Sequence, residues 1–265
     1  MPLAAQQPAT SVTNVIRFTS ASQRAGRLAV TPLQTTCSAC HLRELCLPCG
    51  MNGAEVEQLD SLKFGRRRVK AGQTLYRQGD PFQFIYAVRG GTLKSSLTLP
   101  DGRDQVSGFH IAGEQLGLDG VAHGKHGTTA TALEDTEVCA IPYAHVAQMT
   151  VTGTGSEHLI SRLMSREIVR EQSVMLLLGS MNAEERLAAF LLNLAARLKA
   201  RGYSASEFHL RMTRAEIGSH LGMKLETVSR TFSAFQKQHL LEVDKRHIRI
   251  TNADGLQRAF EMRMH

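Results

Sequence analysis

The sequence predicts an α+β protein in which a β-rich unit is followed by one long helix and a smaller, mainly helical unit. Three observations support this prediction. Short strand-like segments occupy positions 55–145, an uninterrupted helical pattern covers 156–178, and capped short helices around a glycine turn follow near the C-terminus. With 265 residues, of which 42% are hydrophobic, the chain is long enough for one large domain or two ordinary ones.

Residues 1–35 are rich in Ala, Gln, Ser and Thr and show no sustained periodicity, so we expect a disordered tail. The lack of an acidic residue before Glu44 is also typical of an organelle transit peptide, which remains an alternative. We find no apolar run close to the ~20 residues of a membrane-spanning helix and no apolar core of a secretory signal. We therefore expect a cytoplasmic protein that does not associate with membranes.

The segment 36–155 is expected to combine a cysteine-bearing sensory stretch with a β-domain. Its clearest strand is 92–99, where apolar and polar residues alternate between the turn sequences Gly90-Gly91 and Pro100-Asp101-Gly102. Short strands at such close spacing predict a sandwich, roll or barrel. Further segments of the same character are 73–77, 84–88, 106–110 and 137–141.

Residues 156–180 predict one long helix, because neither Gly nor Pro occurs between 156 and 178. One face repeats at steps of three and four residues, close to a coiled-coil seam. A second apolar surface, which includes Leu159 and Leu163, must contact something else. We predict that the seam pairs with a second copy of the chain and that Gly179-Ser180 forms a hinge; burial of both faces within one chain is the alternative. The predicted dimer-interface residues are Ile160, Met164, Ile168, Glu171 and Met175.

The segment 181–265 contains 14 Lys and Arg against 9 Asp and Glu, which is +5 of the chain's net charge of +7. Asn182 with Glu185, and Thr213 with Glu216, have the spacing of capping boxes that start two helices. A further helix follows Gly222, so the pattern predicts two short helices around a glycine turn. A basic segment with this organisation favours a polyanionic partner.

The helix after Gly222 has Val228, Phe232 and Phe235 on one face, which leaves a polar opposite face. On that face, Arg can donate two hydrogen bonds to guanine and Glu can accept one from cytosine. We therefore predict a winged helix-turn-helix that binds double-stranded DNA, with 247–250 in the wing. A helical hairpin with a solvated face is the alternative. The predicted DNA-binding residues are Glu226, Ser229, Arg230, Thr213 and Ser233.

Four of the five cysteines lie within thirteen residues, with the spacing Cys37-x2-Cys40-x5-Cys46-x2-Cys49. Thiolates bind Zn²⁺ and iron–sulfur clusters alike, so the spacing predicts a metal or cluster site without deciding between them. It also leaves open whether Cys49 or the distant Cys139 completes a set of four ligands.

Several long runs resemble the family of the cyclic AMP receptor protein and the fumarate and nitrate reductase regulator, FNR, and they are closer to the FNR branch. The resemblance covers about residues 34–255. It implies an N-terminal β-roll of the cupin-like double-stranded β-helix type, a long dimerisation helix and a C-terminal winged helix-turn-helix. The runs are the cysteine spacing, GFHIAGEQLGLDG, NAEERLAAFLLNL and MTRAEIGSHLGMKLETVSRTFSAFQK.

The resemblance implies an oxygen-labile [4Fe–4S] cluster held by Cys37, Cys40, Cys46 and Cys139, with Cys49 outside the set. It implies an oxygen-responsive transcription regulator that is a homodimer when active. Without oxygen it would bind a palindrome similar to TTGAT-N4-ATCAA, with RNA polymerase as a further partner. The alternative is a regulator of the same fold that has a structural zinc at its N-terminal cysteines and senses another signal.

The family also has a nucleotide-binding branch, which holds its phosphate with an Arg-Ser pair after a Gly-Glu-Leu segment. Here AGEQLGLDG is followed by His126-Gly127-Thr128-Thr129, which lacks that arginine. We therefore expect no cyclic nucleotide. Because we find neither a Gly-rich nucleotide motif nor a clear nucleophilic arrangement, we do not expect an enzyme.

Overall fold

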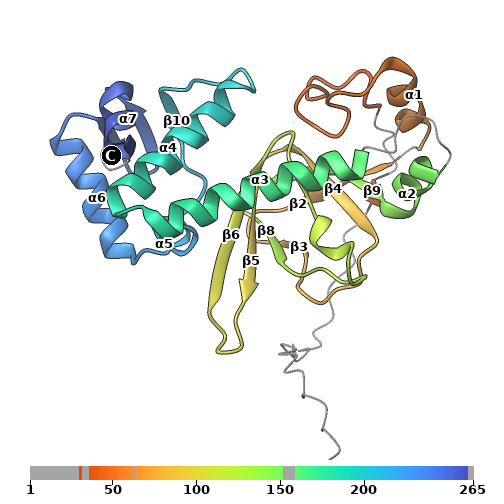
Figure 1. Ribbon diagram of the computed structural model, residues 1–265, viewed down its shortest axis with the longest axis horizontal. Coiled ribbons are helices and arrows are strands. Elements are labelled where there is room, and N and C mark those ends of the chain that lie inside the picture. The colour runs from red at the N-terminus through yellow and green to blue at the C-terminus, as the bar shows by residue number, and fades with distance from the viewer. Residues whose placement is uncertain (1–29, 32–35, 63, 152–158, 262–265) are drawn as a thin grey trace, which may run out of the picture.

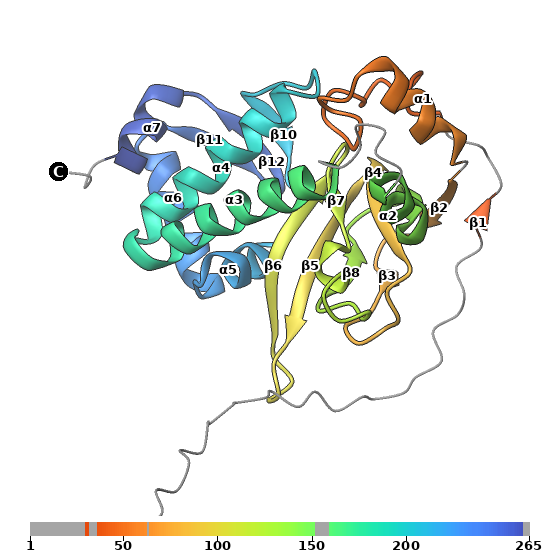
Figure 2. The same ribbon diagram turned by 45° about the vertical axis from the view of Figure 1, so that its right-hand side comes forward.

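The computed structural model describes residues 30–31, 36–62, 64–151 and 159–261. Figures 1 and 2 show a β-rich unit at one end, the long helix α3 across the molecule, and a helical unit at the other end, which confirms the predicted fold class. The elements are β1 (Val30–Thr31), α1 (Gly53–Ser61), β2 (Gly65–Val69), β3 (Thr74–Tyr76), β4 (Phe84–Gly90), β5 (Thr92–Thr98), β6 (Asp104–Ile111), β7 (Gln115–Leu116), η1 (Leu118–Gly120), β8 (Thr129–Ala132), β9 (Thr136–Pro142), α2 (Tyr143–Val151), α3 (Leu159–Ser180), α4 (Ala183–Lys199), β10 (Glu207–His209), α5 (Arg214–Leu221), α6 (Leu225–Lys237), β11 (Leu241–Asp244), β12 (His247–Ile250) and α7 (Ala253–Glu261).

The predicted disordered tail lies outside the described residues, apart from Val30–Thr31, which pair with β2. The start predicted for the long helix, at residue 156, is outside them as well. None of the helices in the described ranges combines the length and the apolar character that crossing a bilayer requires.

Two antiparallel sheets form the β-rich unit, with strand orders β1-β2-β9-β4-β7 and β3-β8-β5-β6. Their facing sides enclose an apolar core that includes Val138 and Ala140 of β9. Because side chains alternate along a strand, Cys139 and Ile141 lie on the other face of the same sheet. There they join a second core with the cysteine loop (residues 36–51), α1 and the start of α3.

Helix α3 uses its second apolar surface as expected, because Leu159 and Leu163 are buried against the β-rich unit. The hinge predicted at Gly179-Ser180 is wrong, since both residues continue the helix. Arg186 of α4 explains why: its guanidinium donates to the carbonyl of Leu178 at 2.8 Å and so satisfies a helix-end acceptor. The chain changes direction after α3 instead, where Asn182 caps α4 in a capping box.

The C-terminal unit contains the predicted helix-turn-helix. Thr213 and Glu216 form the capping box of α5, and Gly222 ends it in the left-handed region with φ +62°. The predicted buried face of α6 is confirmed, because Val228, Phe232 and Phe235 are at most 1% exposed. A three-stranded sheet, β10-β12-β11, packs beside these helices and supplies the wing.

Gly91, between β4 and β5, combines φ +88° with close backbone neighbours: a Cβ there would lie 2.8 Å from Thr136 Cα. Gly72 has a similar φ of +78° but has no atom within 4 Å of such a Cβ. We expect Gly72→Ala to lower the free energy of unfolding by about 1 kcal/mol through left-handed strain, and Gly91→Ala by roughly 3 kcal/mol or more, since overpacking adds to that strain. Chemical denaturation measures both; equal losses would refute the steric argument.

Candidate functional site

The cysteine loop is built from consecutive tight turns. The N–H of Cys40 donates to the Cys37 carbonyl at 3.1 Å, and the N–H of Cys49 donates to the Cys46 carbonyl at 3.1 Å. Asp60 of α1 fixes the start of the loop, because its carboxylate accepts hydrogen bonds from the backbone N–H groups of Cys37 and Ser38. The loop is therefore held by backbone contacts that leave the thiols to face the protein core.

Strand pairing places Cys139 in the middle of the five-stranded sheet, opposite Arg66 of β2 on one side and Ala87 of β4 on the other. Cys139 shares the second core with Cys37 and Cys46. The thiol of Cys37 interacts electrostatically with those of Cys40, Cys46 and Cys139. The fold thus brings together three cysteines of the loop and one cysteine about ninety residues further along the chain.

Cys49 has a different position. It lines a cavity of about 910 Å³ that lies between α3, β6 and α4. It is not among the main groups that perturb Cys37 or Cys46. The spacing of the cysteines does not distinguish Cys49 from Cys139 as the fourth candidate ligand. The strand register does, because it directs Cys139 toward the cysteine loop.

Burial raises the pKa of the Cys37 thiol, and the neighbouring Cys46 and Cys139 raise it further. Burial likewise raises the pKa of Cys46, to about 11, against a hydrogen bond from the Gln115 side chain that lowers it. Without a cation these thiols therefore stay protonated. A bound soft metal centre would reverse this preference, because its charge stabilises thiolates. The donor set fits such a centre.

The gathered thiols do not close on one point. Across the described ranges, no three His, Cys, Asp or Glu side chains are arranged to hold a single metal ion. A tetrahedral zinc site needs its sulfurs around one atom, whereas a four-iron cluster takes one cysteine on each iron.

The exposed side of α3 carries an apolar stripe. Ile168 and Met175 of the predicted seam are 53% and 70% exposed, and Val169 and Leu176, which the heptad pattern missed, are 59% and 60% exposed. Val169 follows Ile168 in the sequence and Leu176 follows Met175, so the exposed apolar surface is wider than the predicted seam. Two other predicted seam residues, Ile160 and Met164, pack instead against the second core of their own chain.

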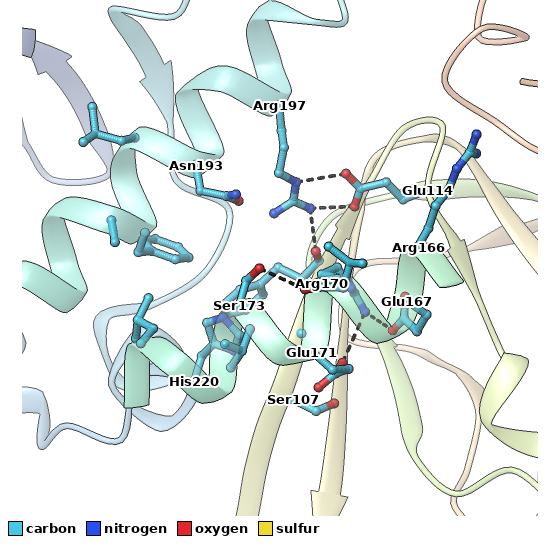
Figure 3. A pocket seen from close by; sticks show the side chains of 18 of the residues that line it. Ser107, Glu114, Arg166, Glu167, Arg170, Glu171, Ser173, Asn193, Arg197 and His220 are labelled. Atoms are coloured by element: carbon cyan, nitrogen blue, oxygen red, sulfur yellow. Dashed lines mark hydrogen bonds and ion pairs between the residues drawn. The ribbon is translucent and has the colours of Figure 1, made fainter. Parts of the chain in front are cut away.

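Glu171 lies at the edge of this stripe, with its carboxylate 3.7 Å from the Arg170 guanidinium (Figure 3). Burial raises the pKa of its carboxyl, Arg170 lowers it and Glu167 raises it again. A second copy of the helix would bring another carboxylate and remove more water. A carboxylate at this position of the predicted seam would therefore oppose pairing with a second copy of the helix.

The outer face of α6 presents Glu226, Arg230 and Ser233 to solvent, with Ser229 half-buried between them. The hydroxyl of Thr213 takes part in the capping box of α5: it donates to the Glu216 carboxylate at 2.9 Å and accepts from the Glu216 N–H at 3.2 Å. The turn between β11 and β12 adds the exposed cations Lys245 and Arg246. The surface thus combines polar side chains on the outer face of α6 with positive charge in the wing.

Two family models match the chain. Residues 185–259 match the Crp-like helix-turn-helix domain, and residues 66–152 match the cyclic nucleotide-binding domain. The matched ranges contain the helix-turn-helix in one case and most of the two sheets in the other.

Known proteins resemble the whole arrangement. The chain is 45% identical over 231 residues to the transcriptional regulatory protein btr of Bordetella pertussis, which covers 87% of this chain and 96% of the relative. It is 41% identical over 220 residues to the fumarate and nitrate reduction regulatory protein of Escherichia coli K12, which covers 83% and 88%. The structure of FixK2 from Bradyrhizobium japonicum matches with a TM-score of 0.69 at 29% identity, over 74% of this chain and 96% of that chain. Together with its helix-turn-helix and paired sheets, these likenesses show that the chain belongs to the CRP/FNR family of transcriptional regulators.

Proposed function

We propose that this protein is an oxygen-responsive regulator that binds DNA as a homodimer while it holds a [4Fe–4S] cluster. The observation that carries the proposal is the gathering of Cys139 with Cys37 and Cys46 in one core, with Cys40 near enough to Cys37 to perturb its thiol. The curated relatives named for fumarate and nitrate reduction support it. Zinc at the N-terminal cysteines is the less favoured candidate, because Cys49 stands apart from the gathered thiols.

The same core links the cysteines to the dimerisation helix. When bound, the cluster supplies an oxygen-sensitive cross-link between the loop and the sheet. Leu159 and Leu163 of α3 pack in the core that contains Cys37 and Cys46. Arg162 of α3 also donates to the carbonyl of Gly50 at 2.7 Å, within the cysteine loop and directly after Cys49. A change in the loop therefore alters the support of α3, and with it the balance between pairing and the repulsion at Glu171.

We propose that the dimer reads a TTGAT-N4-ATCAA-like palindrome through Glu226, Ser229 and Arg230, with support from Thr213 and Ser233. A two-fold DNA site requires two recognition helices about one helical turn apart. Pairing of two α3 helices would fix this spacing. We also propose RNA polymerase as a partner and no catalytic activity of the chain itself; the relatives are transcriptional regulators.

We propose that no cyclic nucleotide is used, although the β-rich unit matches a model of nucleotide-binding domains. The N–H and hydroxyl of Thr128 donate to the Asp119 carboxylate at 2.7 and 2.9 Å. His126 is buried and its ring stacks on Tyr76 with centroids 3.8 Å apart. The segment where the resemblance places a phosphate pocket thus presents a carboxylate, which repels phosphate.

The cluster and zinc candidates predict opposite results for two cysteine variants. After anaerobic incubation with iron and sulfide, Cys139→Ala should hold neither above background, because it loses the ligand from the sheet. Cys49→Ala should load as well as the wild type. Iron and acid-labile sulfide analysis measures both. Zinc that is retained by Cys139→Ala and lost from Cys49→Ala would instead establish a structural zinc at the N-terminal cysteines.

Removing the carboxylate from the seam should strengthen pairing of the unloaded chain. We expect Glu171→Ala to lower the dimer dissociation constant about tenfold, the equivalent of ~1.4 kcal/mol. Burial raises the pKa of Glu171, so protonation removes the repulsion and wild-type pairing should strengthen as the pH falls through that pKa. Sedimentation velocity in air measures both effects.

The dimer dissociation constant of Glu171→Ala should lack this pH dependence. Glu184→Gln is the control, because Glu184 is an exposed carboxylate in the first turn of α4 and lies outside the predicted seam. An unchanged dissociation constant in Glu171→Ala would contradict the role of Glu171.

Arg230 and Arg246 should affect DNA binding differently. Arg230→Ala should cost about 1–3 kcal/mol on the palindrome and little on random DNA, since Arg230 lies on the outer face of α6. Arg246→Ala should weaken binding to both and reduce the salt slope by about one. Anisotropy titrations of the loaded protein at several salt concentrations measure this. Equal losses on both DNAs for Arg230→Ala would exclude base reading.

A further inference from the structure

The turn between β6 and β7, residues 111–115, is held in a fixed conformation. The N–H of Glu114 donates to the Ile111 carbonyl at 3.1 Å, and the N–H of Gly113 donates to Val88 of β4 at 2.8 Å. The N–H of Val88 in turn donates to the Glu114 carbonyl at 2.9 Å. Gly113 has φ +88°, a conformation that favours glycine. The turn therefore behaves as a rigid part of the sheet.

One side of this turn contacts the cysteine loop. A Cβ on Gly113 would lie 3.1 Å from Leu45 Cβ, so the backbone of the turn packs closely against the residue that precedes Cys46. The side chain of Gln115 donates to the Gly113 carbonyl at 2.9 Å and lies near enough to Cys46 to lower the pKa of its thiol. The position of the third cysteine is thus coupled to the turn by the packing of Leu45 against Gly113.

The other side of the turn holds the end of α4, in the DNA-binding unit. The carboxylate of Glu114 accepts from Arg197 Nε at 2.9 Å and from Arg201 Nη2 at 2.8 Å, and Figure 3 shows Arg197 directed at Glu114. The same arginines reach the backbone of the turn region: Arg197 donates to the Phe109 carbonyl at 2.7 Å, and Arg201 donates to that of Ala112.

The three side chains are shielded from water, with exposed fractions of 23% for Arg197, 6% for Arg201 and 21% for Glu114. Charge-assisted hydrogen bonds of this kind are strong and directional. Removing the carboxylate would leave a buried guanidinium without its partner, which is costly. Glu114 therefore fixes the end of α4 to the turn far more firmly than a surface ion pair would.

We propose that residues 113–115 transmit the state of the cysteine loop to α4 within a single chain. A shift of Cys46 or Leu45 displaces the turn, and Glu114 passes the displacement to Arg197 and Arg201. This route is additional to pairing through α3 and needs no second chain. The nature of the signal rests on the proposed function, whereas the link rests on the contacts alone.

A second ion pair between the two units provides a control. Lys94 of β5 pairs with Glu216 of α5 at 2.7 Å. Neither residue belongs to the turn or to the cysteine loop. Lys94→Met removes one ion pair between the units and Glu114→Gln removes two, but only Glu114→Gln interrupts the proposed route.

Hydrogen–deuterium exchange of the full chain at residues 195–203 tests the proposal. Glu114→Gln should exchange about tenfold faster there than the wild type, because the end of α4 opens more often. Anaerobic loading with iron and sulfide should slow exchange at 195–203 in the wild type and in Lys94→Met, but not in Glu114→Gln. In unloaded protein, Cys46→Ala should speed exchange at 195–203, and this response should also disappear in the Glu114→Gln background.

A wild-type response in Glu114→Gln, or its loss in Lys94→Met, would overturn the proposal. If Glu114→Gln fails to fold, Arg197→Gln replaces it, since Arg201 keeps its partner in that variant and the response should be reduced. Protein that takes up no iron would refute the proposed function alone. The Cys46→Ala comparison would then decide the coupling, and unchanged exchange at 195–203 in that variant would refute it.

Discussion

The register of β9 between β2 and β4 is the constraint on which the site depends. Side chains alternate along a strand, so a slip of one residue would move Cys139 to the opposite face of the sheet. There it would face the core between the sheets, which holds Val138 and Ala140, and not the cysteine loop. Backbone pairing on both sides of β9 thus positions a cysteine that lies more than ninety residues from the three gathered cysteines of the loop.

Helix α3 reconciles two demands. Its buried residues, Leu159 and Leu163, anchor it on the core that contains the cysteines, while its outer stripe remains available to another chain. In the proposed function, Glu171 opposes pairing through this stripe and keeps the free energy of pairing small enough for a change at the anchored end to decide it. Without that carboxylate, the proposal expects pairing whatever the state of the loop.

The sequence predicted most elements whose signals are local. Capping boxes at Asn182 and Thr213 need only residues three positions apart, and the buried face of α6 follows from helical spacing. The hinge at Gly179-Ser180 failed because composition alone does not reveal Arg186, which supports the helix end from the next helix.

Contacts between residues far apart in the sequence could not be predicted from local patterns. Glu114 meets Arg197 and Arg201 across 83 and 87 residues, and no periodicity connects them. Nothing in the spacing of the cysteines distinguishes Cys49 from Cys139; the sheet does. The ligand set of the cysteine site followed only from the family resemblance, and it remains a proposal.

The stripe on α3 also has a consequence for the fate of the protein in a cell. An unpaired chain leaves Ile168, Val169, Met175 and Leu176 more than half exposed. Contiguous apolar surface of this kind invites nonspecific aggregation and capture by quality-control machinery. Under the proposed function, whatever separates the two chains would therefore also shorten the lifetime of each, so that loss of pairing would lower the abundance of the protein.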